Sequence, residues 1–175
     1  LSAAGRDPGQ FYAFNHNGLI IEDSPGTREF QKPYARPRSE IDGWDVADPH
    51  RVNLLETVRN AQPTILIGTS ARGGAFSEEG VREMHSYCER PVIMPLSNPT
   101  DRCEARPSDL LDWTDGKALI ATGSPFEPVR RGSVHHTIAQ ANNALIFPGL
   151  GLGVSVVRAR LVSEEMIYAA AQALA

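Results

Sequence analysis

Four short apolar runs recur between residues 64 and 147, and each is followed at once by small or polar residues. The runs contain four or five residues and show no alternation with polar side chains. Such runs are typical of strands that are covered on both faces, as in a parallel sheet. The pattern therefore predicts four parallel strands, at residues 64–67, 92–96, 118–121 and 144–147.

Helix signals lie before, between and after these runs. A capping residue followed by proline or acidic residues marks a helix start. By this signal, helices are expected to begin near Asp48, Ser77, Pro107 and Ser163, and a buried helix is expected over residues 154–157. Strand, loop and helix in repeated succession predict a parallel sheet with right-handed crossovers. The expected fold class is α/β, a Rossmann-like doubly wound parallel sheet.

The first fifty residues follow a less regular pattern. Two short apolar runs, 11–14 and 19–21, are joined by turn-forming residues and predict two short strands. Residues 22–47 are rich in proline, glycine, arginine and acidic residues, so they predict a surface loop.

The carboxyl ends of the predicted strands carry small or hydrogen-bonding residues, at 68–70, 97–98, 122–124 and 149–151. Open parallel sheets bind ligands beyond these ends. Small residues let a ligand reach the backbone, and amides at a helix start hold phosphate or carboxylate groups. The alternative is that these loops are only tight turns, which favour the same residue types.

Two glycine-rich segments differ from the dinucleotide fingerprint Gly-x-Gly-x-x-Gly. Residues 68–76 have its strand-to-helix context without its spacing, and residues 149–153 lack the third glycine at the required offset. The unit that carries the fingerprint is expected before Leu1, which leaves the fold incomplete at its N-terminus. Apolar groups that such a unit covers are then expected to be exposed, namely the helix face of Val52, Leu55 and Val58 and the strand runs at Ile65 and Val92.

Three asparagines are the most informative polar residues. Asn98 follows a predicted strand, and Asn142 and Asn143 form a pair just before the last apolar run. A neutral amide at a strand end orients a carboxylate or amide ligand without adding charge. The alternative is an Asx-turn or a helix cap. No spacing indicates a metal site or a Ser/His/Asp set.

Charge and composition argue against several partners. The net charge of −4 and the pI of about 5.7 give no support for a nucleic-acid or anionic-membrane partner. No apolar run approaches the roughly 20 residues that cross a bilayer, and the first residues show no secretion signal. The two cysteines, Cys88 and Cys103, form no disulfide framework, which favours a reducing cytoplasm.

Several segments together resemble the cofactor domain of malic enzymes, in the family's order and at similar spacing. They are residues 64–70, 73–79, 95–100, 121–126, 140–143 and 146–153. The resemblance extends from about Phe11 to the end of the chain, and residues 30–37 resemble the bacterial branch. It implies that residues 1–175 are the NAD(P)-binding Rossmann-like domain, without its first βαβ unit and without the N-terminal catalytic domain.

The resemblance implies a reaction for the complete enzyme. That enzyme oxidises (S)-malate with NAD or NADP and releases pyruvate and CO₂, with Mg²⁺ or Mn²⁺ as a Lewis acid. It acts on a small-molecule substrate, and a homo-oligomer is expected.

The resemblance also implies roles for individual residues. Gly68, Thr69 and Ser70 match a cofactor-lining loop, and Ser97 and Asn98 complete the cofactor-binding set at the next strand. Asn98 matches the asparagine that contacts malate and the nicotinamide region. Asn142 and Asn143 match the pair of which one binds the substrate carboxylate.

Two positions depart from the family pattern. Asn15 stands where the family usually has an aspartate that holds the adenosine ribose. Asn15 remains a cofactor-binding candidate, but the lost charge weakens the usual preference for NAD over NADP. Arg72 stands where an apolar residue is common, and it either pairs with a cofactor phosphate or reaches solvent.

The family's catalytic tyrosine and lysine, metal-binding carboxylates and phosphate-binding glycine loop are expected before Leu1. No catalytic and no metal-binding residue is therefore assigned within the chain, and the chain alone is expected to be inactive. A different class of function is a non-catalytic half-domain that binds a nucleotide or a partner. A third is another hydroxy-acid or amino-acid dehydrogenase, against which the runs 97–100 and 142–149 argue. The parent reading frame discriminates, because upstream tyrosine, lysine and carboxylates favour the enzyme and a gene start near Leu1 favours the binding module.

Overall fold

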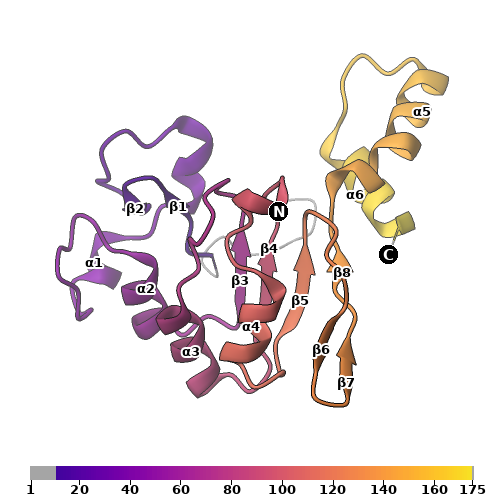
Figure 1. The fold of residues 1–175 in the computed structure, drawn as a ribbon. Helices are drawn as coiled ribbons and strands as arrows, with labels where there is room; N and C mark the ends of the chain where they lie inside the picture. The colour runs from indigo at the N-terminus through magenta and orange to yellow at the C-terminus, as the bar shows by residue number, and fades with distance from the viewer. Residues whose placement is uncertain (1–10, 175) are drawn as a thin grey trace.

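The computed structural model describes residues 11–174. The domain was predicted over residues 1–175, so its two ends lie outside the described residues. The first residues, which show no secretion signal in the sequence, are among them. Figure 1 shows the elements in chain order. The first half contains β1 (Phe14–Asn15), β2 (Gly18–Leu19), η2 (Glu29–Tyr34), α1 (Arg38–Ile41), α2 (Leu54–Ala61), β3 (Ile65–Gly68) and α3 (Glu78–Tyr87). The second half contains β4 (Val92–Pro95), η3 (Thr100–Arg102), α4 (Pro107–Trp113), β5 (Leu119–Thr122), β6 (Val129–Arg131), β7 (Val134–His136), β8 (Ala139–Gln140), η4 (Asn143–Leu145), α5 (Phe147–Val157) and α6 (Glu164–Leu174).

The centre of the fold is a parallel sheet with the strand order β3-β4-β5-β8. Ile65 pairs with Val92, and Val92 pairs with Leu119, so the first three strands begin in register. These three strands run parallel because helical crossovers join one strand to the next. The prediction of a Rossmann-like α/β fold with a parallel sheet is confirmed.

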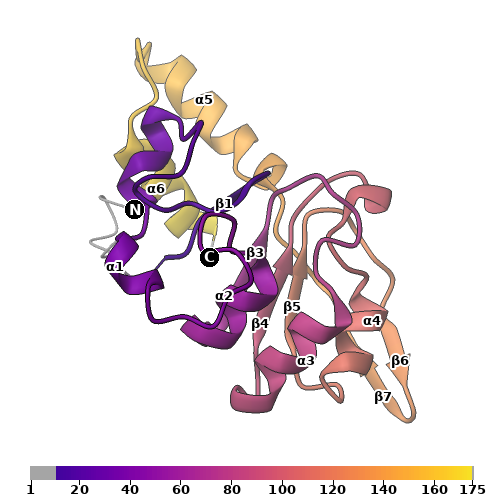
Figure 2. The same ribbon diagram turned by 90° about the vertical axis from the view of Figure 1, so that its left-hand side faces the viewer.

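Three helices cover one face of the sheet. Residues of α2, α3 and α4 pack on the strand residues Leu66 and Ile93, and Figures 1 and 2 show these helices together on one side. The expected caps explain part of this, because the Ser77 hydroxyl accepts a hydrogen bond from the Gly80 amide at the start of α3. Because β3, β4 and β5 follow one another in one direction, right-handed crossovers place their helices on the same face.

The opposite face of the sheet is exposed. Ile65 and Ile67 are each 55% exposed and Leu119 is 46% exposed, although all three lie in strands. The expectation that the apolar runs are covered on both faces is therefore wrong for this chain, whereas the expectation that the run at Ile65 is exposed is confirmed. The physical reason is the one-directional strand order, which leaves this face without a helix of its own.

The fourth predicted strand, at residues 144–147, is wrong. This segment forms η4 and the start of α5, and the strand at the edge of the sheet is β8 instead. The apolar run continues to Val157, which is long enough for a helix, and Pro148 fits the first helical turn. The glycines 149, 151 and 153 consequently lie inside α5 and do not form a loop at a strand end.

The segment before β3 also differs from the prediction. The helix begins at Leu54 and not near Asp48, because Asn53 caps it and forms a reciprocal capping box with Glu56. The Asp48 carboxylate instead accepts a hydrogen bond from the His50 amide. The predicted loop at 22–47 contains η2 and α1, and the two predicted strands are shortened to the pairs β1 and β2.

The N-terminal segment has a small core of its own. Leu19, Ile21, Ile41 and Val52 are buried together, and Val58 is buried against the sheet. The expectation that Val52 and Val58 are uncovered is therefore wrong, because the β1–β2 segment and the sheet cover them. Among the described residues, no helix combines the length and the apolar character needed to cross a bilayer.

We predict that the chain of residues 1–175 self-associates through the exposed sheet face. Lysine at both Ile65 and Ile67 should shift the chain toward a monomer, because it places charge on the apolar face without disturbing a buried contact. Analytical ultracentrifugation measures this shift. Val134→Lys is the matched control, because Val134 is equally exposed (53%) in the β6–β7 hairpin. A monodisperse monomer of the unaltered chain would contradict the prediction.

Candidate functional site at the carboxyl edge of the sheet

The loops that follow β3, β4, β5 and β8 lie side by side at one edge of the sheet. Backbone hydrogen bonds connect them in series: Leu96 donates to Gly68, Gly123 donates to Pro95, and Ala141 donates to Thr122. Every predicted site residue except Asn15 lies in or beside these loops. By strand, they are Gly68, Thr69 and Ser70; Ser97 and Asn98; Asn142 and Asn143. The fold therefore brings these predicted residues to one edge.

A buried carboxylate joins the first two loops. Glu104 is 0% exposed, and its Oε1 accepts hydrogen bonds from the Ser70 amide (2.8 Å), the Ser70 hydroxyl (2.8 Å) and the Ser97 hydroxyl (2.5 Å). Its Oε2 lies 3.4 Å from the Ser97 amide, which donates to it. No sequence motif singled out this residue. The only sequence signal was an acidic residue placed between Cys103 and Ala105, both of which are buried.

Glu104 is ionised at neutral pH for a specific reason. Burial disfavours its charged form, but hydrogen bonds from Ser97 and Ser70 outweigh burial and hold the pKa of Glu104 below its usual value. Because the folded pKa lies below that of the unfolded chain, the carboxylate stabilises the fold above the unfolded pKa. That contribution is lost as the pH falls through the folded pKa.

Ser97 and Ser70 differ in their accessibility. Ser97 is 6% exposed, and its hydroxyl donates to Glu104 while accepting from the Ala71 amide at 2.8 Å. Ser70 and Thr69 are exposed at the edge of the sheet, as is Arg72. The hydroxyl of Ser97 is thus fully used inside the protein, whereas the loop of Thr69 and Ser70 faces outward.

Asn98 is exposed and held in one orientation. Its Oδ1 accepts a hydrogen bond from the Ser124 hydroxyl at 2.6 Å, and its Nδ2 lies 3.4 Å from the Leu96 carbonyl. Ser124 itself is buried, so the contact fixes Asn98 from below. One N–H of the Asn98 amide remains free for a ligand, because an amide nitrogen carries two donors.

Asn142 and Asn143 have different surroundings. The Asn142 side chain donates to the Gly123 carbonyl at 2.9 Å and accepts from the Ala144 amide at 2.9 Å, so it links the β5 loop to the cap of η4. Asn142 is therefore a helix cap, which was the alternative to a ligand-binding role in the sequence. Asn143 is exposed, and its side chain makes no hydrogen bond with any other residue in the described range.

Asn15 lies apart from these loops, at the end of β1. Its side-chain oxygen accepts from the Asn17 amide at 2.7 Å, which is an Asx-turn. Asn17 in turn lines an open depression of about 250 Å³, together with Ser24, His50 and Arg51.

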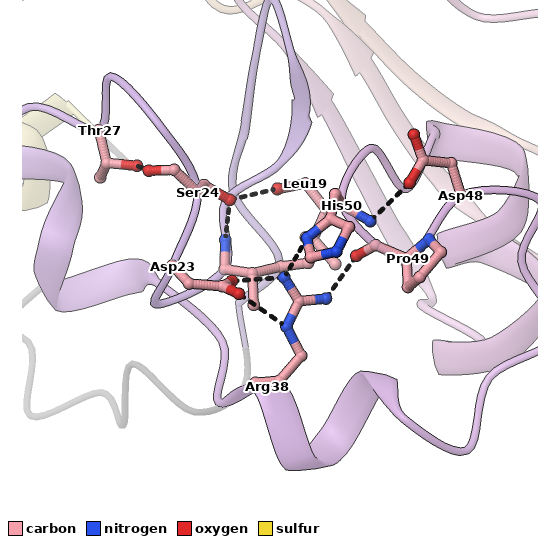
Figure 3. Close-up of polar contacts among 9 residues, drawn as sticks. Leu19, Asp23, Ser24, Thr27, Arg38, Asp48, Pro49 and His50 are labelled. Atoms are coloured by element: carbon pink, nitrogen blue, oxygen red, sulfur yellow. Dashed lines mark hydrogen bonds and ion pairs between the residues drawn. The ribbon is translucent and has the colours of Figure 1, made fainter.

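A polar cluster lies beside this depression and shares His50 with its lining. Figure 3 shows Arg38 between Asp23 and the Pro49 carbonyl, with His50 beside it. The hydrogen bond from Arg38 holds the pKa of Asp23 below its usual value. Arg38 and Asp23 thus tie the 22–50 segment together.

No three His, Cys, Asp or Glu side chains in residues 11–174 lie in an arrangement that could hold a metal ion. Glu104 is surrounded by hydrogen-bond donors only, which does not suit a cation ligand. The residues present do not fit Mg²⁺ or Mn²⁺, and we assign them no metal-dependent step.

We predict that Gly123→Ala destabilises the domain. A Cβ at Gly123 would lie 2.0 Å from the Leu96 carbonyl oxygen and 2.9 Å from Asn98 Nδ2, so the β4 and β5 loops would have to separate. Overpacking of this kind costs about 1–3 kcal/mol or more. Gly43→Ala is the control, since a Cβ there meets nothing within 4 Å. Chemical denaturation of the two variants measures the difference, and equal free energies of unfolding would contradict the packing argument.

The comparisons with known proteins agree with this architecture. Residues 5–175 match the family described as "Malic enzyme, NAD binding domain". The chain is 53% identical over 158 residues to an NAD-dependent malic enzyme of Pseudomonas aeruginosa (strain LESB58), covering 90% of this chain and 28% of that protein. It is 51% identical over 167 residues to NAD-dependent malic enzyme 3 of Bacillus subtilis (strain 168), covering 95% of this chain and 30% of that protein.

The match covers almost all of this chain but less than a third of these relatives' length. The family resemblance proposed from the sequence motifs is confirmed by the family match and by the level of identity. On this basis the chain belongs to the malic enzyme NAD-binding domain family.

Proposed function

We propose that this chain is the cofactor-binding part of a malic enzyme that oxidises (S)-malate and decarboxylates the product to pyruvate and CO₂. The observation that carries the proposal is the row of loops at the carboxyl edge of a parallel sheet, where this fold class binds ligands. The relatives are NAD-dependent malic enzymes, which supports NAD as the cofactor. The metal-binding carboxylates, and the tyrosine and lysine of the proposed chemistry, would come from other parts of the polypeptide.

The exposed groups at this edge suit a dinucleotide and a dicarboxylate. Thr69 and Ser70 offer hydroxyl and backbone groups beyond β3, where we place the cofactor. Asn98 offers a free amide N–H between the β4 and β5 loops, where we place the nicotinamide and malate. Asn143 is an exposed amide on the adjoining turn, and we assign the substrate carboxylate to it in preference to Asn142, whose side chain is already engaged.

The choice between NAD and NADP depends on the adenosine end. An aspartate at the Asn15 position would repel a 2′-phosphate, and Asn15 does not. His50 and the positively charged Arg51 line the neighbouring depression. We therefore propose NAD as the main cofactor, with NADP tolerated more readily than in a relative that has aspartate here.

The cysteines and the exposed apolar surfaces bear on the compartment and the assembly of the enzyme. Cys88 and Cys103 are both free, which agrees with a reducing compartment such as the cytoplasm. A homo-oligomer agrees with the exposed apolar sheet face and the exposed apolar residues of α5.

We predict that Asn98→Ala, in the full-length enzyme that contains this chain, harms catalysis more than stability: kcat/KM for malate falls, and the melting temperature falls only slightly, through the loss of the Ser124 hydrogen bond. The lost hydrogen bond to ligand should cost about 1–3 kcal/mol of transition-state stabilisation. Steady-state kinetics and thermal unfolding measure the two quantities. Asn60→Ala is the control, because the Asn60 side chain is bonded only to backbone groups of Asp45 and Glu56, away from the strand ends. An unchanged kcat/KM in Asn98→Ala would remove Asn98 from the site.

We predict that the chain of residues 1–175 alone does not turn over malate. The described residues hold no metal site, and the chain spans less than a third of its relatives. An assay with malate, Mn²⁺ and NAD or NADP should show no reduced nicotinamide above background. Measurable turnover by the pure chain would contradict the assignment of the catalytic groups to other parts of the polypeptide.

A further inference from the structure

We propose that Glu104 is a positioning residue for cofactor binding, which sets the relative placement of the β3 and β4 loops by accepting hydrogen bonds from both. This inference rests on the proposed function, because it concerns the same edge of the sheet. It assigns a role to a fully buried residue that the sequence motifs did not single out.

The Glu104 carboxylate lies between the loops that follow β3 and β4. Glu104 lies on the segment between η3 and α4, yet its side chain reaches Ser70 after β3 and Ser97 after β4. Its backbone carbonyl also accepts a hydrogen bond from the Phe76 amide, just before α3. One residue therefore connects the loop after β3, the start of α3 and the loop after β4.

The Glu104 carboxylate is buried without an opposite charge, which is energetically unfavourable. Burying a carboxylate is unfavourable unless it is paired or well hydrogen-bonded. No Lys, Arg or His of the described chain forms an ion pair with Glu104, and its neighbours at the carboxylate are the four serine donors. An apolar side chain would fill the same space without this desolvation cost, so the charge is better explained by the loops that it holds than by stability alone.

The backbone around Glu104 is shaped to accommodate its side chain. Gly68 is buried beneath the carboxylate, and a Cβ at this position would lie 2.5 Å from Glu104 Cδ. Ala71 adopts a left-handed conformation with φ of 53°, which non-glycine residues rarely adopt, and its amide donates to Ser97 Oγ. The loop that carries Thr69 and Ser70 is thus held in an otherwise unfavourable shape by the Ser97–Glu104 contact.

The test uses Glu104→Gln in the full-length enzyme. Glutamine keeps the shape of the side chain, removes its charge and replaces one acceptor oxygen with a donor among serine donors. Isothermal titration calorimetry should show a Kd for NAD about tenfold higher than in the wild type, the loss expected for one hydrogen bond to a charged group. The KM for NAD should rise in parallel, with a smaller change in kcat.

Glu56→Gln is the matched control. Glu56 is also a buried carboxylate (8% exposed) that accepts two backbone hydrogen bonds, from Ala47 and Asn53, but it lies on α2 away from the strand ends. A purely structural role for Glu104 predicts that both variants lose thermal stability while both keep the wild-type Kd for NAD. That outcome would overturn the proposal.

A second variant covers the case in which Glu104→Gln does not fold. Ser97→Ala removes one donor to the carboxylate and the acceptor of the Ala71 amide, and it leaves Glu104 in place. A raised Kd for NAD in this variant supports the proposal, and an unchanged Kd overturns it. If the wild-type enzyme neither binds NAD nor oxidises malate, it is the proposed function that fails. If the wild type is active and the variants bind NAD normally, only the role of Glu104 fails.

Discussion

The buried carboxylate of Glu104 is the contact on which the functional edge of this domain depends. Parallel strands end at the same edge, and backbone hydrogen bonds such as that from Leu96 to Gly68 join their loops only at the first residues beyond the strands. A single side chain that accepts from both serines supplies the missing connection. The surrounding glycine and the left-handed Ala71 are consequences of that arrangement, because each makes room for it or follows its hydrogen bonds.

The faces and the carboxyl edge of the sheet have different surroundings. Three helices cover one face and build the main core, while the strand ends remain open to ligand. Gly123 lets the β4 and β5 loops approach to a separation that no side chain would tolerate, and this brings Ser124 against Asn98. The opposite face of the sheet keeps apolar residues in solvent, because helices that cross over in one direction cover only one side.

The sequence predicted the parts of the fold that depend on local patterns. The runs that became β3, β4 and β5, and the helix capped by Ser77, follow from apolar periodicity and capping chemistry. The run at 144–147 was misassigned because a four-residue apolar segment has no period of its own, and the helix is revealed only by its continuation to Val157. Glu104 was beyond prediction for another reason: its partners, Ser70 and Ser97, lie 34 and 7 residues away, and their approach exists only after the strands pair.

The central claim is that the loops held by Glu104 form the NAD-binding edge. Hydrogen–deuterium exchange of the full-length protein, with and without NAD, tests it most directly. The account predicts that NAD slows exchange in peptides covering residues 69–72, 97–100 and 122–126, while the β6–β7 hairpin is unaffected. Unchanged exchange in those three loops at saturating NAD, with protection elsewhere in the chain, would contradict it.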